Sequence, residues 1–145
     1  MRTIIAVALV AAALGALPAA AAPPQTATFT VIERFDSGSG VFASDGSVLC
    51  ASGTTTNNTF ATGFQSDRGV IFHVRKTITC SDGSGTFTLQ IQARTGFNVG
   101  DLTSGPWVVW DGTGDYANLQ GQGTVTGTFF PDGVSDVYTG WLAFR

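Results

Sequence analysis

The sequence predicts an all-β fold: a single antiparallel β-barrel of seven or eight strands with one disulfide. Apolar and polar residues alternate with period two along most of residues 23–145, and the 3.6-residue period of an amphipathic helix is almost absent. Such runs recur at roughly 8 to 12 residue spacing between turns rich in Gly, Asp and Ser, which is typical of a barrel or a sandwich. Glycines inside or beside the predicted strands, at Gly123, Gly127 and Gly140, favour the barrel, because a closing sheet must bend sharply.

The clearest strand begins after the two prolines at 23 and 24. Residues 26–35 place Ala27, Phe29 and Val31 on one face and threonines on the other. Residues 70–80 and 86–94 flank a turn with the sequence Ser-Asp-Gly-Ser-Gly, so they are predicted to form a hairpin. The other predicted strands are 47–51, 59–64, 107–110, 124–130 and 137–144, with a short apolar piece at 41–43 and a polar turn at 54–58.

Composition excludes two broad classes of protein. The 145 residues carry a net charge of −3, and the 7 basic residues are scattered, so the chain lacks the clustered cations of a nucleic-acid binder. With 43% hydrophobic and 11% aromatic residues, the chain has enough apolar surface to form a core, which argues against disorder.

Residues 1–22 have the features of a secretory signal. Met1 and Arg2 give a positive start, residues 4–17 are apolar, and residues 18–22 are Pro and Ala. Cleavage after Ala21 or Ala22 would leave one domain, residues 23–145. The short, Ala-rich signal looks bacterial, so we expect a secreted or periplasmic protein whose mature form has no membrane partner.

Export makes a disulfide between Cys50 and Cys80 the expected state of the two cysteines. A metal site is disfavoured, because the lone His73 has no Cys or His partner at ligand spacing. If 47–51 paired directly with 70–80, the two cysteines would lie at opposite ends of the hairpin. We therefore expect 59–64 to lie between them as a separate strand, which brings both cysteines toward one end.

Residues 107–123 carry a Gly-Thr-Gly, aromatic, small, Gly pattern. Its positions are Gly112, Thr113, Gly114, Tyr116, Ala117, Leu119 and Gly121. Gly112 and Gly114 permit a tight turn after a strand, and Tyr116 and Leu119, three apart, can close one barrel end as a single helical turn. This segment resembles the allene oxide cyclase barrel-like superfamily, which includes the dirigent proteins. The resemblance implies an eight-stranded barrel with a central apolar cavity, used without a cofactor for cyclisation or radical coupling.

Two charged residues interrupt the apolar faces of predicted strands. Glu33 continues the series of Phe29 and Val31, and Lys76 continues that of Val70, Phe72 and Val74. An inward charge in an apolar cavity acquires a shifted pKa or a partner, and acid–base sites use this environment. Two other roles stay open for both residues: charged ends that reach solvent at a barrel mouth, or a packed buried ion pair.

The predicted ligand site lies inside the barrel. Glu33 and Lys76 are its polar groups, and Trp107, Tyr138 and Trp141 are among its walls. His73 and Arg75 fall on the opposite face, and Asp111 and Asp115 are explained by turn hydrogen bonds.

Two functions follow from such a site. The first is a binding or structural role, in which the barrel holds a small apolar ligand or contacts another protein. The alternative is a cofactor-free isomerase or cyclase. Neither needs a metal or a cofactor.

Overall fold

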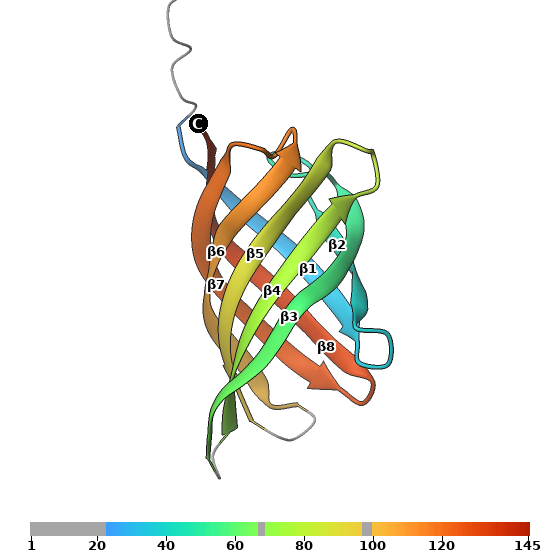
Figure 1. The fold of residues 1–145 in the computed structure, drawn as a ribbon, viewed down its shortest axis with the longest axis vertical. Helices are drawn as coiled ribbons and strands as arrows, with labels where there is room; N and C mark the ends of the chain where they lie inside the picture. Colours follow the sequence, from blue (N-terminus) through green and yellow to red (C-terminus); the bar gives the residue numbers. More distant parts are fainter. Residues whose placement is uncertain (1–22, 67–68, 97–99) are drawn as a thin grey trace, which may run out of the picture.

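A computed structural model describes residues 23–66, 69–96 and 100–145; the predicted signal, residues 1–22, lies outside them. Eight strands form one closed barrel, in which each strand pairs antiparallel with the next and the last pairs with the first (Figure 1). The predicted fold class is confirmed. The strands are β1 (Gln25–Arg34), β2 (Ser39–Ser44), β3 (Ser52–Ser66), β4 (Gly69–Cys80), β5 (Gly85–Thr95), β6 (Leu102–Gly114), β7 (Leu119–Phe130) and β8 (Gly133–Phe144).

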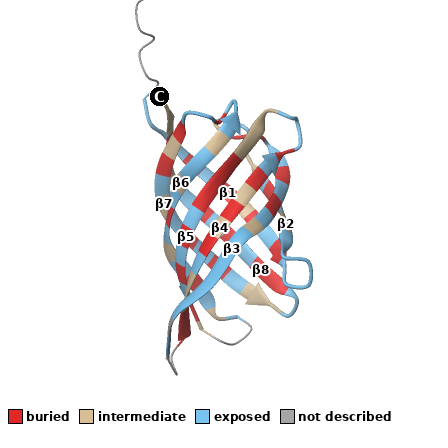
Figure 2. Ribbon diagram, viewed as in Figure 1, coloured by how far each residue is buried: buried red, intermediate tan, exposed pale blue. Residues whose placement is uncertain are grey.

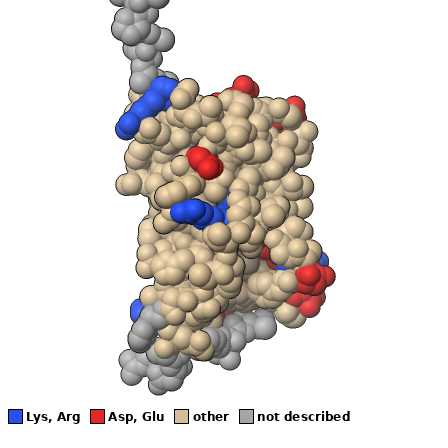
Figure 3. Space-filling model, in the orientation of Figure 1, with Lys and Arg blue, Asp and Glu red and all other residues tan. Residues whose placement is uncertain are grey.

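Period-two alternation places one face of each strand inside the barrel. In β5 the inward side chains are Phe87, Leu89, Ile91 and Ala93, all buried, as the sequence predicts. Buried and exposed residues alternate along the strands in Figure 2. Outward positions hold many threonines, and Figure 3 shows few charged side chains on the viewed face. No helix among the described residues is long and apolar enough to cross a membrane.

Aromatic rings fill the middle of the barrel as a connected column. The Phe29 ring stacks on Tyr138, with centroids 4.8 Å apart, and contacts Phe42 at 5.6 Å. Phe42 contacts Phe87 at 5.7 Å, and Phe87 contacts Tyr116 at 5.3 Å. The column therefore runs from the centre of the barrel to the turn after β6.

This turn closes one end of the barrel, which we call the disulfide end. Tyr116 and Leu119 are buried, and the Leu119 amide donates to the Tyr116 carbonyl at 3.0 Å, so the predicted one-turn plug is confirmed. The Tyr116 hydroxyl accepts a 2.8 Å hydrogen bond from the Cys50 amide. Cys50 and Cys80 form the predicted disulfide at this end.

The predicted strand assignment around Cys50 is wrong. Residues 45–51 form the connection after β2, and β3 is one strand over Ser52–Ser66 that includes the predicted turn at 54–58. β3 and β4 pair directly, with Gly53 opposite Cys80. Because Cys50 lies just before β3 begins and Cys80 lies where β4 ends, a plain hairpin brings them together without an intervening strand.

Candidate functional site

A cavity of about 420 Å³ opens inside the other half of the barrel. It lies toward the connections between β1 and β2 and between β7 and β8, which we call the cavity end. Tyr138 lines the cavity and stacks on Phe29, so the cavity stops where the aromatic column begins. The apolar walls come from β3, β4, β5, β7 and β8, with these residues: Phe60, Phe72, Val74, Ile91, Ala93, Val125, Phe129 and Val134.

A buried polar cluster lies on the cavity wall, with the Lys76 ammonium at its centre. Lys76 Nζ lies 3.1 Å from Glu33 Oε1 and 3.7 Å from Asp136 Oδ2, and it donates to the Tyr138 hydroxyl at 3.1 Å. The Tyr138 hydroxyl in turn donates to Asp136 Oδ2 at 3.4 Å. Glu33, Lys76 and Asp136 are only 8%, 2% and 6% exposed. Three strands, β1, β4 and β8, thus bring two acids and one base together.

Glu33 is held by neighbours on β3. Thr55 Oγ1 donates to Glu33 Oε1 at 3.3 Å, and Asn57 Nδ2 donates to Glu33 Oε2 at 3.4 Å. Gly40 pairs with Glu33 across β1 and β2, and a Cβ at Gly40 would lie 2.8 Å from both Glu33 Cγ and Thr55 Oγ1. Glycine at this position therefore leaves the room that the Glu33 side chain occupies.

A glycine on the paired strand also leaves room for the Asp136 carboxylate, on the other side of the cluster. Its strand partner on β7 is Gly127, and a Cβ at Gly127 would collide with Asp136 Oδ1. Oδ1 is buried and has no hydrogen-bond partner among the described residues. Two more buried oxygens on the cavity wall, Asn57 Oδ1 and Thr103 Oγ1, also have no partner there. Three unpartnered acceptors in one cavity are unusual for a packed interior, where such groups are normally hydrogen-bonded.

The electrostatics of the cluster follow from burial and the two acids. Burial lowers the pKa of Lys76, but Tyr138, Glu33 and Asp136 around the ammonium outweigh burial and raise this pKa above its usual value, so Lys76 stays protonated. Burial raises the pKa of Asp136 above the usual 3.8; Lys76 opposes this rise and Glu33 adds to it. Burial also raises the pKa of Tyr138, which keeps its phenol as a donor.

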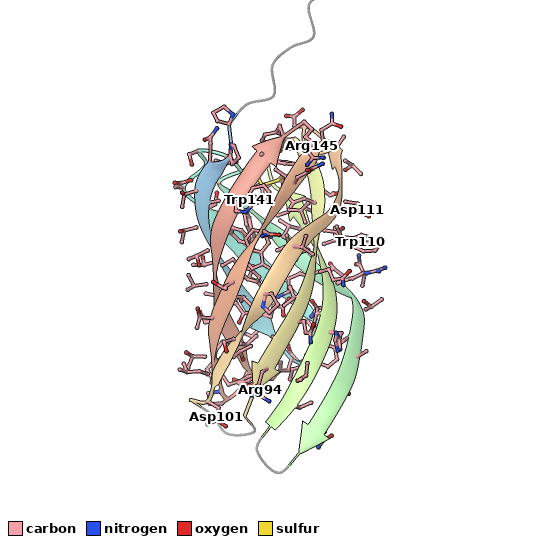
Figure 4. All side chains as sticks on the ribbon, turned by 90° about the vertical axis from the view of Figure 1, so that its left-hand side faces the viewer. Arg94, Asp101, Trp110, Asp111, Trp141 and Arg145 are labelled. Atoms are coloured by element: carbon pink, nitrogen blue, oxygen red, sulfur yellow. A yellow bond between two sulfur atoms is a disulfide. The ribbon has the colours of Figure 1, made fainter. Side chains whose placement is uncertain are left out.

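The five residues of the predicted site separate into two groups. Glu33, Lys76 and Tyr138 meet at the cavity. Trp107 is buried in the aromatic column, 5.6 Å from Phe29, and does not line the cavity. Trp141 is 39% exposed and lies on the outer face of β8 (Figure 4), so its predicted place in the cavity wall is wrong. Odd and even positions of β8 face opposite ways, and Tyr138 and Trp141 have opposite parity.

Side chains that were predicted to lie outward do so. His73 is exposed, and Arg75 Cζ lies 3.9 Å from the centroid of the Trp110 ring. Trp110 points outward from the barrel (Figure 4). Asp111 and Asp115 are exposed near the disulfide end, but the turn hydrogen bonds predicted for their side chains are not seen among the described residues, and Asp111 lies within β6. Among the described residues, no group of three His, Cys, Asp or Glu side chains could hold a metal ion.

Asp136 is the main site residue that the sequence reasoning missed. The predicted strand began at 137, which left Asp136 in the preceding turn, although Val134, Asp136 and Tyr138 share one alternating face. Extending the predicted strand back by a single residue would have included Asp136. Thr55 and Asn57 were missed because they fell in the predicted turn at 54–58.

Comparison of the chain with models of known protein families and with curated proteins finds no match. The resemblance of residues 107–123 to the allene oxide cyclase barrel-like superfamily therefore stays a prediction from those residues.

Proposed function

We propose that this protein binds a compact, mainly apolar molecule in the barrel cavity, with one polar group of the ligand against the cluster around Lys76. The cavity carries this proposal. Its volume of about 420 Å³ lies within the range of about 300 to 1,000 Å³ that small-molecule sites occupy. Apolar walls with a few polar groups at one point are the usual composition of such sites.

A purely structural role for the cluster accounts for less of what is observed. A buried ion pair stabilises a fold only when its remaining hydrogen-bonding atoms are satisfied, and apolar residues of similar volume often replace it without loss. Here Asp136 Oδ1 lacks a partner, and the acids adjoin open space instead of packed side chains. A ligand that fills this space would pack against the cluster, because Glu33, Lys76 and Asp136 line the cavity.

We further propose that the protein works outside the cytoplasm. The Cys50–Cys80 disulfide is compatible with an oxidising periplasmic or extracellular location. The predicted signal at residues 1–22 supports the same location. A binding protein in this location would take up its ligand from the periplasm or the medium.

The second candidate is a cofactor-free isomerase or cyclase that acts in the same cavity. The observation that favours it is the meeting of a lysine, two carboxylates and a phenol within hydrogen-bonding reach, with a raised Asp136 pKa. Such groups can donate and accept protons during a rearrangement. Chromatography coupled to mass spectrometry of a bound ligand after incubation separates the two functions: a binding protein returns the ligand at its original retention time, and an enzyme returns an isomer of the same mass at a different retention time.

Fluorescence titration with 1-aminonaphthalene, a neutral and mainly apolar fluorophore small enough for the cavity, tests binding there. Ala93 lines the cavity, so Ala93→Phe should fill part of it and weaken binding about tenfold, which corresponds to about 1.4 kcal/mol. Ala61→Phe is the matched control, because Ala61 is exposed on β3. Absence of binding by the wild type, or equal affinity of the wild type and a folded Ala93→Phe variant, would contradict the proposal.

A further inference from the structure

A second hollow lies on the outer face of the barrel, across β5, β6, β7, β8 and the start of β1, and we call it the outer hollow. Its volume is about 750 Å³, and Trp141 on the outer face of β8 forms part of its wall (Figure 4). The polar and aromatic side chains that line it at the surface include Gln90, Gln92, Gln122, Thr124, Thr139 and Trp141. We propose that the outer hollow binds a neutral saccharide, with a sugar ring against the Trp141 indole.

This site is separate from the cavity inside the barrel. Among the described residues, the two spaces share no lining residue. The inference therefore adds a second site and does not rest on the function proposed for the cavity.

Strand register places the lining side chains of the outer hollow in one row across the sheet. Gln90 lies opposite Val108, which in turn lies opposite Gln122. Gln122 lies opposite Trp141, and Trp141 lies opposite Thr26 of β1. Side chains directly opposite each other on neighbouring antiparallel strands have Cβ atoms about 4.5 to 5.5 Å apart. The Gln122 amide therefore lies beside the indole ring, within reach of a ligand that contacts the ring.

A ligand can reach the polar atoms of this row directly. Gln90, Gln92 and Gln122 are exposed, and within the described part of the chain no hydrogen bond occupies their side-chain amides. Trp141 is 39% exposed, and its ring stacks on no other ring of the described residues. Three open amides and one open indole ring are thus available at the same surface.

The lining of the outer hollow carries no formal charge. None of its described lining residues is Asp, Glu, Lys or Arg. Arg75 lies opposite Gln90 at the edge of the hollow, but its guanidinium lies over the Trp110 ring. An anionic ligand, such as a nucleotide, would find no charge-assisted partner here. A purely apolar ligand would cover the amides without giving them hydrogen-bond partners.

A saccharide matches both parts of this lining. Its hydroxyl groups donate and accept hydrogen bonds, as side-chain amides do. The hydroxyls of Thr124 and Thr139, which lie 3.2 Å apart, add further donors and acceptors. The C–H face of a pyranose ring can pack on an indole ring such as that of Trp141. A protein partner fits less well, because the exposed apolar lining is limited to Pro106, Val108 and Trp141, and a stable interface needs a larger apolar core.

The floor of the outer hollow is supported from inside the barrel. Gly123 and Gly140 are paired across β7 and β8, and a Cβ at Gly140 would lie 2.7 Å from Trp107 Cζ2. Neither glycine has a positive φ, so the room for the Trp107 ring accounts for the glycine at position 140. Trp107 Nε1 donates to the Thr124 carbonyl at 3.1 Å. The buried indole therefore holds the wall in place before a ligand binds, which lowers the entropic cost of binding.

NMR titration of the isotope-labelled protein with cellobiose tests the inference. A disaccharide of about 23 non-hydrogen atoms, at about 30 Å³ each, occupies about 690 Å³ and so fits the hollow. In β-linked glucose the hydroxyls lie at the ring edge, which leaves apolar C–H faces for the indole. We expect cellobiose to shift the indole N–H signal of Trp141 and the side-chain amide signals of Gln122, and to leave those of Trp110 and Gln120 unchanged.

Two variants and two matched controls measure the contribution of each group. We expect Trp141→Ala to weaken cellobiose binding about tenfold and Gln122→Ala about threefold. Trp110→Ala removes another exposed indole, and Gln120→Ala removes another amide from the same strand; both lie outside the hollow and should change the affinity less than about twofold. Sorbitol, which has hydroxyls but no ring face, should bind at least about tenfold more weakly than cellobiose.

Several results would overturn the saccharide site. These are no shift at the solubility limit of cellobiose, equal binding of sorbitol, or equal losses in Trp141→Ala and Trp110→Ala. Shifts confined to residues of the internal cavity would place the sugar there instead. Shifts at Trp141 that follow protein concentration without any sugar would show that a second copy of the chain covers this face. None of these results bears on the cavity function, because 1-aminonaphthalene binding tests it separately.

Discussion

Lys76 balances two carboxylates in the barrel interior, so its replacement leaves both without a cation. Lys76→Met keeps a similar length of apolar side chain and removes the charge. We expect a loss of about 3 to 5 kcal/mol in the free energy of unfolding at pH 7, the cost of breaking a buried ion pair from one side. Urea denaturation measures it. The control is Arg75→Met, one residue away on the outer face, which should cost about 1 kcal/mol or less. Equal effects of the two substitutions would contradict the described cluster.

Asp136 should make stability depend on pH in a defined direction. Because burial raises its folded-state pKa above 3.8, the folded protein holds this proton more tightly than the unfolded chain. The stabilisation is complete below the unfolded value and is lost as pH rises through the raised folded value. We therefore expect the wild type to lose stability relative to Asp136→Asn as pH rises from about 4 toward neutrality.

Urea denaturation of both proteins across this pH range gives the difference directly. Asp45 and Asp82, whose pKa values are lowered by hydrogen bonds from Ser47 and Ser84, contribute equally to both proteins and cancel. A difference that is flat with pH, or that grows in favour of the wild type, would contradict the raised pKa of Asp136.

Half of the cluster could be predicted from single residues. Alternation along β1 and β4 correctly predicted that Glu33 and Lys76 point inward. The prediction holds because β1 has no bulge in its pairing with β8, and β4 has none in its pairing with β5. Their meeting could not be predicted, since it depends on the register between strands that are far apart in the chain. The role of the glycines opposite Glu33 and Asp136 could not be predicted either. A glycine makes room for a neighbouring side chain only if strand register places that side chain beside it.

At the scale of elements, β3 shows where sequence patterns mislead. Its Thr- and Asn-rich first half is typical of a turn, yet residues 52–56 pair with β2 on one side and residues 53–66 pair with β4 on the other. Backbone pairing on both sides outweighs the weak strand preference of Asn. The error shifted the predicted position of Cys50 by one element and produced the wrong explanation of the disulfide.

The disulfide should stabilise the end of the barrel that it closes. Its two cysteines are 30 residues apart in sequence, so the chain-entropy model gives about 3.5 kcal/mol for the cross-link. We expect Cys50→Ala/Cys80→Ala to lower the free energy of unfolding by this amount. Reduction of the wild type should have the same effect, which controls for the cavity left by the sulfur atoms. A loss below about 1 kcal/mol would show that β3 and β4 need no cross-link.

At the scale of the whole molecule, the two ends of the barrel differ. The disulfide end is closed by Tyr116 and Leu119 and by the aromatic column, whereas the cavity end holds the open space and the buried charges. Alternation and turn spacing predict the closed barrel, and the plug followed from residues 112–121. The position of the cavity could not be predicted from the sequence. It depends on how far the large inward side chains of all eight strands fill the barrel along its length.

Methyl NMR during titration with octanol tests the central claim, binding inside the barrel, most directly. The account predicts that octanol shifts the methyl signals of Val74, Ile91 and Val125, which line the cavity, and leaves those of the outward Val41 and Val137 unchanged. No shift at saturating octanol, or shifts confined to Val41 and Val137, would contradict it.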